Sequence, residues 1–282
     1  MNRKKIFDKI CKDIKYLKIQ GATNIAKKAF YAYKLIPTKN SKKTLISLRP
    51  TEPMLYNILK IADKISYAEL IKKLNKSQEK INNEVSKIIK KNSVIFTHCH
   101  SSTLVKALVF SKKIGKKFEV YNTETRPLYQ GKKTAKELSK AKIKVTMFVD
   151  SAAKIALTKE QDKEEKTRPV NIVLLGADAL TKDGVVNKVG SGMFSQIAKS
   201  NHIPVFIVSS FLKFTNKKIK FEQRNPKEIW NPTKKINIKN PSFELIEKKD
   251  IFRIITELGT LSYDNFLKKV KRFDFLITNF YS

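Results

Sequence analysis

The sequence lacks the long apolar segments and the spaced cysteines of membrane and secreted proteins. No apolar run approaches the roughly 20 residues that a transmembrane helix needs. The start, Met1-Asn2-Arg3-Lys4-Lys5-Ile6, has no apolar signal-peptide core. The two cysteines, Cys11 and Cys99, lie far apart and form no framework of pairs. We therefore expect a soluble, cytoplasmic protein with no membrane partner and no structural disulfide.

Arginine is scarce although the chain is strongly basic. Of the 59 Lys and Arg residues only seven are Arg, and the formal net charge is +34. Arg is favoured where phosphates are bound through two hydrogen bonds, whereas Lys spread over every segment is typical of a solvated surface. The charge predicts a generic Lys-rich surface that attracts anionic substrates and can contact nucleic acid nonspecifically. A dedicated nucleic-acid-binding surface is the alternative.

The first ninety residues have the apolar spacing of amphipathic helices. With 41% hydrophobic residues in 282, the chain can bury one large core or two smaller ones. Helical spacing of apolar residues covers 6–17, 25–33 and 53–65, and the polar stretch 37–43 is expected to connect the second and third segments. Ser66 and Glu69 form a capping box that opens a helix toward Lys91.

The remainder alternates short β-branched runs with helical segments, which is typical of parallel βαβ units. The predicted strands are 94–96, 118–121, 145–149, 172–175 and 205–208, and the predicted helices are 103–110, 134–138, 152–157 and 193–199. We predict an α/β fold: a helical N-terminal domain (1–90) followed by a Rossmann-like, doubly wound parallel sheet (91–282). We expect a loop or helix end at 154–168, a helix at 250–258 and an extra strand at 273–278.

Polar or reactive side chains follow each predicted strand, where ligands bind in open parallel sheets. They are Cys99, Glu124, Asp150, Asp178 and the pair Ser209 and Ser210. Asp150 and Ser210 are also expected as helix caps. Asp178 differs because it follows Gly176 and Ala177, and the later Gly190-Ser191-Gly192 before a helix suits an anion site facing Lys188. The pattern is neither a P-loop nor a dinucleotide fingerprint.

Cys99 lies directly after a predicted strand and before a predicted helix. A thiol close to a helix N-terminus and to cations has a lowered pKa, whereas a buried, inert cysteine is the alternative. His98 and His100 flank Cys99, but no second cluster of ligands completes a metal site, so we expect no metal. Cys11 is expected in the core of the first helix.

Two further segments suit anion binding. They are Gln20-Gly21-Ala22-Thr23-Asn24 at a helix start and Ser47-Leu48-Arg49-Pro50-Thr51. Because Arg is scarce, Arg49 and Arg126 are more informative than any single Lys. A structural ion pair is an equally good interpretation of either residue alone.

The ordered motifs together resemble one superfamily, which contains the sugar-phosphate isomerases and the regulatory subunits of initiation factor 2B. The motifs are Gln20-Gly21-Ala22, Arg49-Pro50-Thr51, Thr97-His98-Cys99-His100-Ser101, Thr123-Glu124-Thr125-Arg126-Pro127 with Gln130-Gly131, Asp150-Ser151-Ala152-Ala153, Gly176-Ala177-Asp178 and Asn187-Lys188-Val189-Gly190. The isomerases carry a Cys and an Asp at the positions of Cys99 and Asp178, and the translation subunits typically lack this pair. The motif His98-Cys99-His100-Ser101 is most similar to that of the archaeal ribose-1,5-bisphosphate isomerases.

The resemblance implies that a ring-opened sugar phosphate is isomerised through a cis-enediolate to ribulose 1,5-bisphosphate, with no metal or redox cofactor. It implies that Cys99 transfers the carbon proton and that Asp178 acts on the sugar oxygens, although the roles could be exchanged. It also places Gly21, Ala22 and Arg49 at one phosphate. The resemblance further implies that Asn187, Lys188, Gln130 and Lys213 lie around the sugar and the other phosphate. The partners implied are a small phosphorylated sugar and further copies of the chain, as a dimer or hexamer.

Some positions depart from the family pattern. Gln20 stands where the family usually has Arg, which removes one bidentate phosphate contact. This departure keeps methylthioribose 1-phosphate open as the substrate. The +34 charge is the best argument for the other alternative, a noncatalytic subunit like those of initiation factor 2B. The retained Cys99 and Asp178 favour an enzyme.

Overall fold

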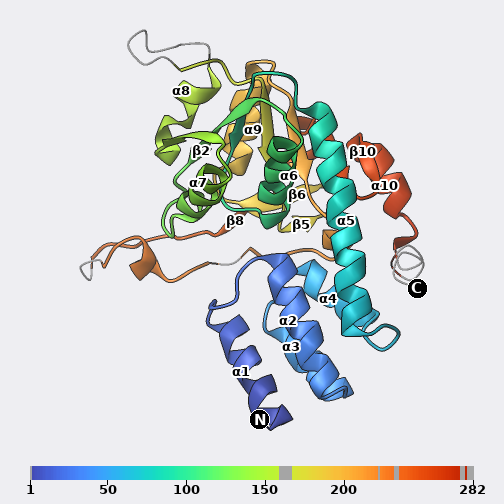
Figure 1. The fold of residues 1–282 in the computed structure, drawn as a ribbon. Coiled ribbons are helices and arrows are strands. Elements are labelled where there is room, and N and C mark those ends of the chain that lie inside the picture. The colour runs from blue at the N-terminus through green and yellow to red at the C-terminus, as the bar shows by residue number, and fades with distance from the viewer. Residues whose placement is uncertain (1, 159–166, 222, 232–234, 274–276, 278–282) are drawn as a thin grey trace.

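The N-terminal helices form a group of their own beside an α/β body (Figure 1). The computed structural model describes residues 2–158, 167–221, 223–231, 235–273 and 277. The helices that precede the first strand are α1 (Arg3–Lys15), α2 (Ala22–Leu35), α3 (Lys39–Ser47), α4 (Pro53–Lys60) and α5 (Tyr67–Ile88). The predicted capping box at the start of α5 is confirmed, because Ser66 and Glu69 bond each other's backbone N–H groups. Within the described ranges, no helix has the length and apolar character of a transmembrane span.

The polar stretch 37–43, predicted as a connection, belongs largely to helix α3. Thr38 caps this helix by accepting a hydrogen bond from the backbone N–H of Ser41, 3.1 Å away. Leu45 is its one fully buried apolar residue. The prediction was wrong because it depended on apolar spacing, whereas this helix is started by a cap and contributes a single side chain to the core.

Seven strands form the main sheet in the order β10-β9-β7-β4-β1-β2-β3. Their bounds are β1 (Ser93–Thr97), β2 (Phe118–Thr123), β3 (Lys144–Phe148), β4 (Ile172–Leu175), β7 (Val205–Val208), β9 (Arg253–Thr256) and β10 (Gly259–Leu261). All neighbours are parallel except β10, which pairs with β9 antiparallel. A smaller antiparallel sheet contains β5 (Ala179–Leu180), β6 (Gly184–Lys188) and β8 (Phe243–Glu247).

Both faces of the main sheet are buried, which confirms the predicted doubly wound α/β fold. Along β1, Phe96 packs into one apolar core while Ile95 packs into the other, because successive side chains point to opposite faces. The helices that connect the strands are α6 (Ser102–Lys113), α7 (Gln130–Lys140), α8 (Ala153–Leu157) and α9 (Ser191–Ser200), and α10 (Tyr263–Val270) follows the last strand, β10. The short 3₁₀ helix η2 (Phe211–Lys213) follows β7.

The predicted helix over 250–258 is a strand instead. A 3₁₀ turn ends at Asp250, and β9 then pairs in parallel with β7 through Ile254 and Ile255. The short apolar run within 250–258 fits the spacing of a helix and of a strand equally well. The segment is a strand because it pairs with the edge of β7. Most of the strand expected over 273–278 lies outside the described residues, as do residues 159–166 of the predicted loop.

Helix α5 connects the N-terminal helices with the sheet (Figure 1). Leu70 and Leu74 in its first half belong to the core that contains the N-terminal helices, and Ile81 and Val85 belong to the core beneath α6. The predicted division into two domains at residue 90 stays a prediction.

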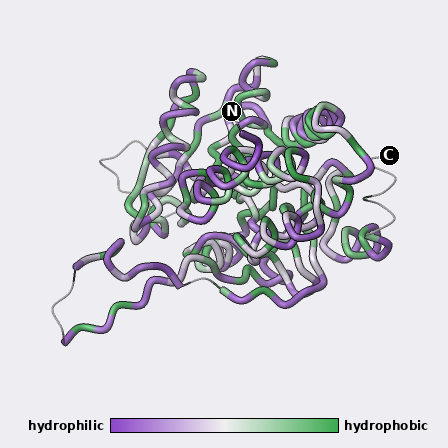
Figure 2. The backbone as a smooth tube through the Cα atoms, turned by 90° about the horizontal axis from the view of Figure 1, so that it is seen from below, coloured by the Kyte–Doolittle hydropathy of each residue, from purple (hydrophilic) through white to green (hydrophobic). Residues whose placement is uncertain are grey.

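One segment leaves the body of the protein, and we call its described residues, 215–221, 223–231 and 235–241, the arm (Figures 1 and 2). Its two sides are joined where Gln223 bridges Pro241 and where the backbone N–H of Arg224 donates to the carbonyl of Asn240, 2.9 Å away. The arm begins beside β5, where the backbone N–H of Thr215 donates to the carbonyl of Leu180 at 2.9 Å, and it ends directly before β8.

Candidate active site

The chain reverses its direction of winding between β1 and β4. From β1 the strands proceed outward through β2 to β3, and the chain then returns to place β4 on the other side of β1. At such a switch point the loops that follow two adjacent strands diverge. The crevice between them is where ligands usually bind in open α/β sheets. Cys99 follows β1 and Asp178 follows β4, so the topology brings these two residues to the same crevice.

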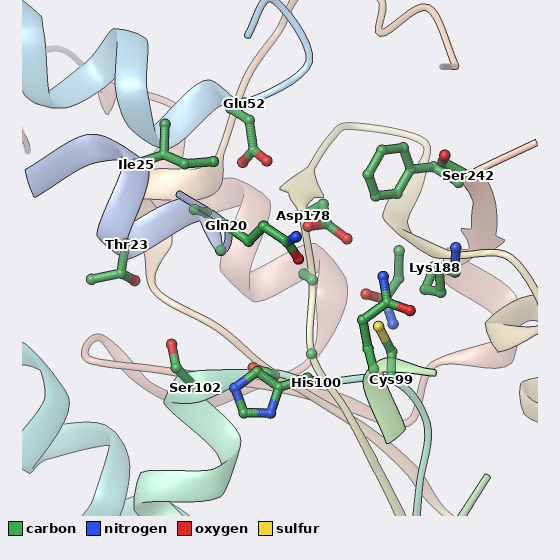
Figure 3. A pocket seen from close by; sticks show the side chains of 18 of the residues that line it. Gln20, Thr23, Ile25, Glu52, Cys99, His100, Ser102, Asp178, Lys188 and Ser242 are labelled. Atoms are coloured by element: carbon green, nitrogen blue, oxygen red, sulfur yellow. The ribbon is translucent and has the colours of Figure 1, made fainter. Parts of the chain in front are cut away.

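A cavity of about 180 Å³ occupies this crevice (Figure 3). Its wall includes every residue to which the family resemblance assigned a catalytic or substrate-binding role: Gly21, Ala22, Arg49, Cys99, Gln130, Asp178, Asn187, Lys188 and Lys213. They come from the start of α2, the loop before α4, the ends of β1 and β4, the start of α7, β6 and η2.

Cys99 has a left-handed backbone, with φ 64°. A non-glycine residue adopts this conformation at a cost, and two hydrogen bonds hold it: the N–H of Cys99 donates to Thr125 Oγ1, 3.0 Å away, and its carbonyl accepts from the hydroxyl of Thr134, 2.8 Å away. Burial, and then the negative charge of Asp178, raise the pKa of the Cys99 thiol to about 12. Of the two alternatives that the sequence left open for this thiol, the structure favours the buried cysteine with a raised pKa, because burial outweighs the nearby cation Lys188.

The two histidines beside Cys99 have separate structural partners. Nε2–H of His98 donates to the carbonyl of Val189, 3.0 Å away, and its Nδ1 accepts from the hydroxyl of Thr123. Burial lowers the pKa of His98 to about 4, so the ring is neutral at pH 7. His100 bonds the hydroxyl of Thr134. Among the described residues, no group of three or more His, Cys, Asp or Glu side chains is arranged to hold a metal ion.

Asp178 lies on the turn between β4 and β5, and close packing fixes that turn. A Cβ at Gly176 would lie 2.6 Å from the Cβ of Ser101, so only glycine lets the turn pass the start of α6. The backbone N–H of Asp178 donates to the carbonyl of Val186, 2.8 Å away. Lys213, on η2, is only 6% exposed, and its ammonium donates a hydrogen bond to the carbonyl of Ala177. This bond connects η2 to the turn and holds the turn in place.

Asn187 and Lys188 end β6 at the cavity, and both are buried. Asn187 Nδ2 donates to Ser191 Oγ at 2.9 Å, and that hydroxyl donates to the carbonyl of Lys188 at 2.6 Å. At Gly190-Ser191-Gly192, where the sequence predicts an anion site together with Lys188, the carboxylate of Glu244 accepts the backbone N–H of Gly192. Lys188 lines the cavity, and the anion site stays a prediction.

The start of α2 contributes backbone rather than side-chain groups. Gly21 caps the helix with φ 82° and supplies no side-chain hydrogen bond, and Ala22 to Asn24 follow it along the cavity wall. Helix N-termini attract anions because their first N–H groups have no partner within the helix. Arg49 lies in the same wall, 3.7 Å from Glu52, so the ion pair considered from sequence exists beside the cavity.

Three other predicted residues have outcomes of their own. Asp150 does not cap its own helix; its carboxylate accepts the backbone N–H groups of Thr125 and Arg126 at 2.9 and 2.7 Å and so supports the loop that holds Cys99. The Arg126 side chain stacks on Tyr129 outside the cavity wall. Ser210 does cap η2, as predicted.

The sequence reasoning missed several residues of the cavity wall. Glu52, Lys133, Arg224 and Ser242 line it as well. The scarcity of Arg was a signal for Arg224, but its position depends on how the arm folds back against β8. Five cationic side chains (Arg49, Lys133, Lys188, Lys213, Arg224) face two carboxylates (Glu52, Asp178), so the cavity favours an anionic ligand.

The fold and the site agree with one protein family. A model of the Initiation factor 2 subunit family matches residues 37–263, and the chain belongs to that family. The chain is 31% identical to the ribose 1,5-bisphosphate isomerase of Methanocaldococcus jannaschii over 296 residues, which cover 93% of each protein. It is 30% identical to the methylthioribose-1-phosphate isomerase of Fervidobacterium nodosum, over 89% of this chain and 81% of that protein.

A solved structure of a family member supports the same fold. The translation initiation factor eIF-2B of Pyrococcus horikoshii OT3 superposes with a TM-score of 0.77 at 25% sequence identity. The superposition covers 91% of this chain and 96% of that one. Proteins named as isomerases and proteins named as translation factors therefore share this architecture.

Proposed function

We propose that this protein is an aldose–ketose isomerase that converts ribose 1,5-bisphosphate to ribulose 1,5-bisphosphate. The observation that carries the proposal is the meeting of Cys99 and Asp178 across one buried, cationic cavity at the switch point of the sheet. The names of relatives about 30% identical support the same substrate class. A binding subunit would have no need for a thiol and a carboxylate at this place.

The reaction needs one proton donor and one proton acceptor on the same substrate. Opening of the ring breaks the bond between C1 and the ring oxygen, which keeps the bonding pair and takes up a proton, and C1 is left as an oxocarbenium ion stabilised by O1. Loss of the C2 proton then forms the C1–C2 double bond of a cis-enediol that carries the phosphate on O1. Loss of the O2 proton and addition of a proton to C1 complete the ketose, so two groups that each give and take one proton suffice.

The raised pKa of Cys99 supports one assignment of these two groups. Cys99 begins as a thiol and gives its proton to the ring oxygen, while the carboxylate of Asp178 takes the C2 proton. Asp178 then returns its proton to C1, and the Cys99 thiolate takes the O2 proton. Both groups are restored, and the roles are exchanged relative to the assignment that the sequence resemblance implied.

The test is an assay of the purified protein with ribose 1,5-bisphosphate and, separately, with methylthioribose 1-phosphate. We expect turnover of the bisphosphate, and a loss on the order of 10²–10⁴-fold in Cys99→Ser and in Asp178→Asn. Cys11→Ser is the matched control, because Cys11 lies on α1 outside the cavity wall. Turnover of neither substrate, or activity that survives both substitutions, would contradict the enzymatic function.

Hydrogen exchange separates the two assignments. With Asp178 as the carbon base, Asp178→Asn abolishes exchange of the C1 proton of ribulose 1,5-bisphosphate with D₂O. If the exchange persists in Asp178→Asn and stops in Cys99→Ser, Cys99 rather than Asp178 is the residue that transfers the carbon-bound proton.

Two partner expectations belong to the same proposal. We expect a homo-oligomer, which analytical ultracentrifugation of the full chain measures directly. We expect only nonspecific contact with nucleic acid through the Lys-rich surface, and such binding decreases steeply between low and physiological salt.

A further inference from the structure

The cavity has two cationic ends with the reactive pair between them. One end is the start of α2 with Arg49, and the other is built around Lys188. In Figure 3 Asp178 lies between Gln20, which precedes α2, and Lys188, and Ser242 lies on the Lys188 side.

Three antiparallel segments bring the Lys188 end together. In the ladder between β6 and β8, Lys188 lies opposite Phe243, and the backbone N–H of Val189 donates to the carbonyl of Ser242, 3.1 Å away. Asn240, two residues before Ser242, accepts the backbone N–H of Arg224. Lys188, Ser242 and Arg224 therefore stand on neighbouring segments at the same wall of the cavity.

The buried hydroxyl of Ser242 indicates that a ligand binds at this end of the cavity. Ser242 is 3% exposed, and its Oγ is buried without a hydrogen-bond partner among the described residues. A buried hydroxyl that makes no hydrogen bond is costly, so such groups are usually satisfied by protein, by water or by a ligand. Ser242 lines the cavity, where an anionic oxygen would accept its hydrogen bond.

Arg224 is held in place from behind. The carboxylate of Glu228 contacts its Nε at 2.8 and 3.1 Å and one terminal nitrogen at 2.5 Å, and Asn240 donates to the same carboxylate at 3.2 Å. Glu228 itself lies outside the cavity wall, whereas Arg224 is part of it. A guanidinium fixed along one edge loses little side-chain entropy when it binds a phosphate.

We propose that Arg224 and Ser242, at the base of the arm, form with Lys188 the site for a second phosphate and so select a sugar bisphosphate over a monophosphate. The inference rests on the proposed function for its substrate class. It adds two residues, both from beyond β7, to the groups that the sequence placed around the ligand.

The test is calorimetric binding of ribulose 1,5-bisphosphate, ribulose 5-phosphate and ribose 1-phosphate, because binding does not depend on turnover. We expect Arg224→Ala and Ser242→Ala each to weaken the bisphosphate on the order of tenfold, in line with a lost hydrogen bond to a charged group. One of the two monophosphates, the one whose phosphate lies at the α2 end, should keep its Kd within about twofold.

Glu228→Gln is the matched control. It weakens the same ion pair as Arg224→Ala but leaves the guanidinium, so we expect bisphosphate binding that is unchanged or tighter. Equal weakening in Arg224→Ala and Glu228→Gln would overturn the proposal, since the pair would then act only structurally. Equal weakening of all three ligands, or of none, would overturn it as well. Wild-type protein that binds the bisphosphate selectively without isomerising it would contradict the proposed function and leave this inference standing.

Discussion

The carboxylate of Glu257 accepts the backbone N–H of Phe211 at 2.9 Å and thereby joins the end of β9 to the start of η2. Ser210 and Ser77 donate their hydroxyls to the other oxygen of the same carboxylate, each at 2.6 Å. Burial raises the pKa of Glu257, and these hydrogen bonds oppose that effect. The carboxyl group thus holds the 3₁₀ helix that carries Lys213 to the turn of Asp178.

Glu257→Gln should impair catalysis through this connection. The amide of Gln cannot accept from all three donors, so we expect kcat/KM to decrease about tenfold and the free energy of unfolding to decrease by about 1–3 kcal/mol. Asp250→Asn is the matched control, a buried carboxylate before the opposite end of β9 that pairs with Lys199 at 3.2 Å. A kcat/KM effect no larger than that of Asp250→Asn would contradict the positioning role of Glu257.

The Cys99 thiol should react slowly with iodoacetamide. With Cys11 replaced by Ser, we expect alkylation at pH 8 to be far slower than that of an exposed thiol and to rise with pH up to pH 10, because the pKa is about 12. Asp178→Asn removes a negative charge that raises this pKa and should accelerate the reaction, as followed by mass spectrometry. Asp183→Asn, at an exposed position beyond β5, should leave the rate unchanged. A rate that is already constant by pH 8 would show that the thiolate dominates.

His98 should make the fold sensitive to acid. Its pKa is about 4 in the folded chain and about 6.5 in an unfolded one, so the unfolded state binds more protons between these values. Stability contributed by neutral His98 is therefore full above pH 6.5 and is lost as the pH falls, by up to about 3 kcal/mol. Urea unfolding at pH 7 and pH 4.5 should show a smaller difference in His98→Gln than in the wild type. His202→Gln, at an exposed position, should retain the wild-type difference.

Gly131 should be essential for the start of α7. A Cβ at this residue would lie 1.8 Å from the carbonyl oxygen of Thr123, and the neighbouring Gln130 lines the cavity. We expect Gly131→Ala to cost about 3 kcal/mol in the free energy of unfolding. Gly115→Ala meets no atom within 4 Å and is strained only by its φ of 86°, so its cost should be about 1 kcal/mol. Equal costs in thermal or urea unfolding would contradict the close approach.

The strands and the residues that follow them could be predicted from sequence because those signals are local. A run such as Val94-Ile95-Phe96 reports its own burial, and the capping box of Ser66 and Glu69 is complete within four residues. The segment 250–258 was misassigned because its short apolar run fits two periods, and only the edge of β7 selected the strand. Helix α3 was missed for the opposite reason, since its cap is local but its contribution to the core is one residue.

By itself the sequence determined that a thiol and a carboxylate follow strands of an α/β sheet, and that glycines adjoin them. Tertiary structure alone decided the protonation of Cys99, because the pKa depends on burial by segments far away in the chain. It also decided that Asp150 supports a neighbouring loop, that Glu244 occupies the start of α9, and that the arm brings Arg224 and Ser242 to Lys188. These outcomes depend on which distant segments come into contact in the folded chain, and the spacing of residues along the sequence does not show those contacts.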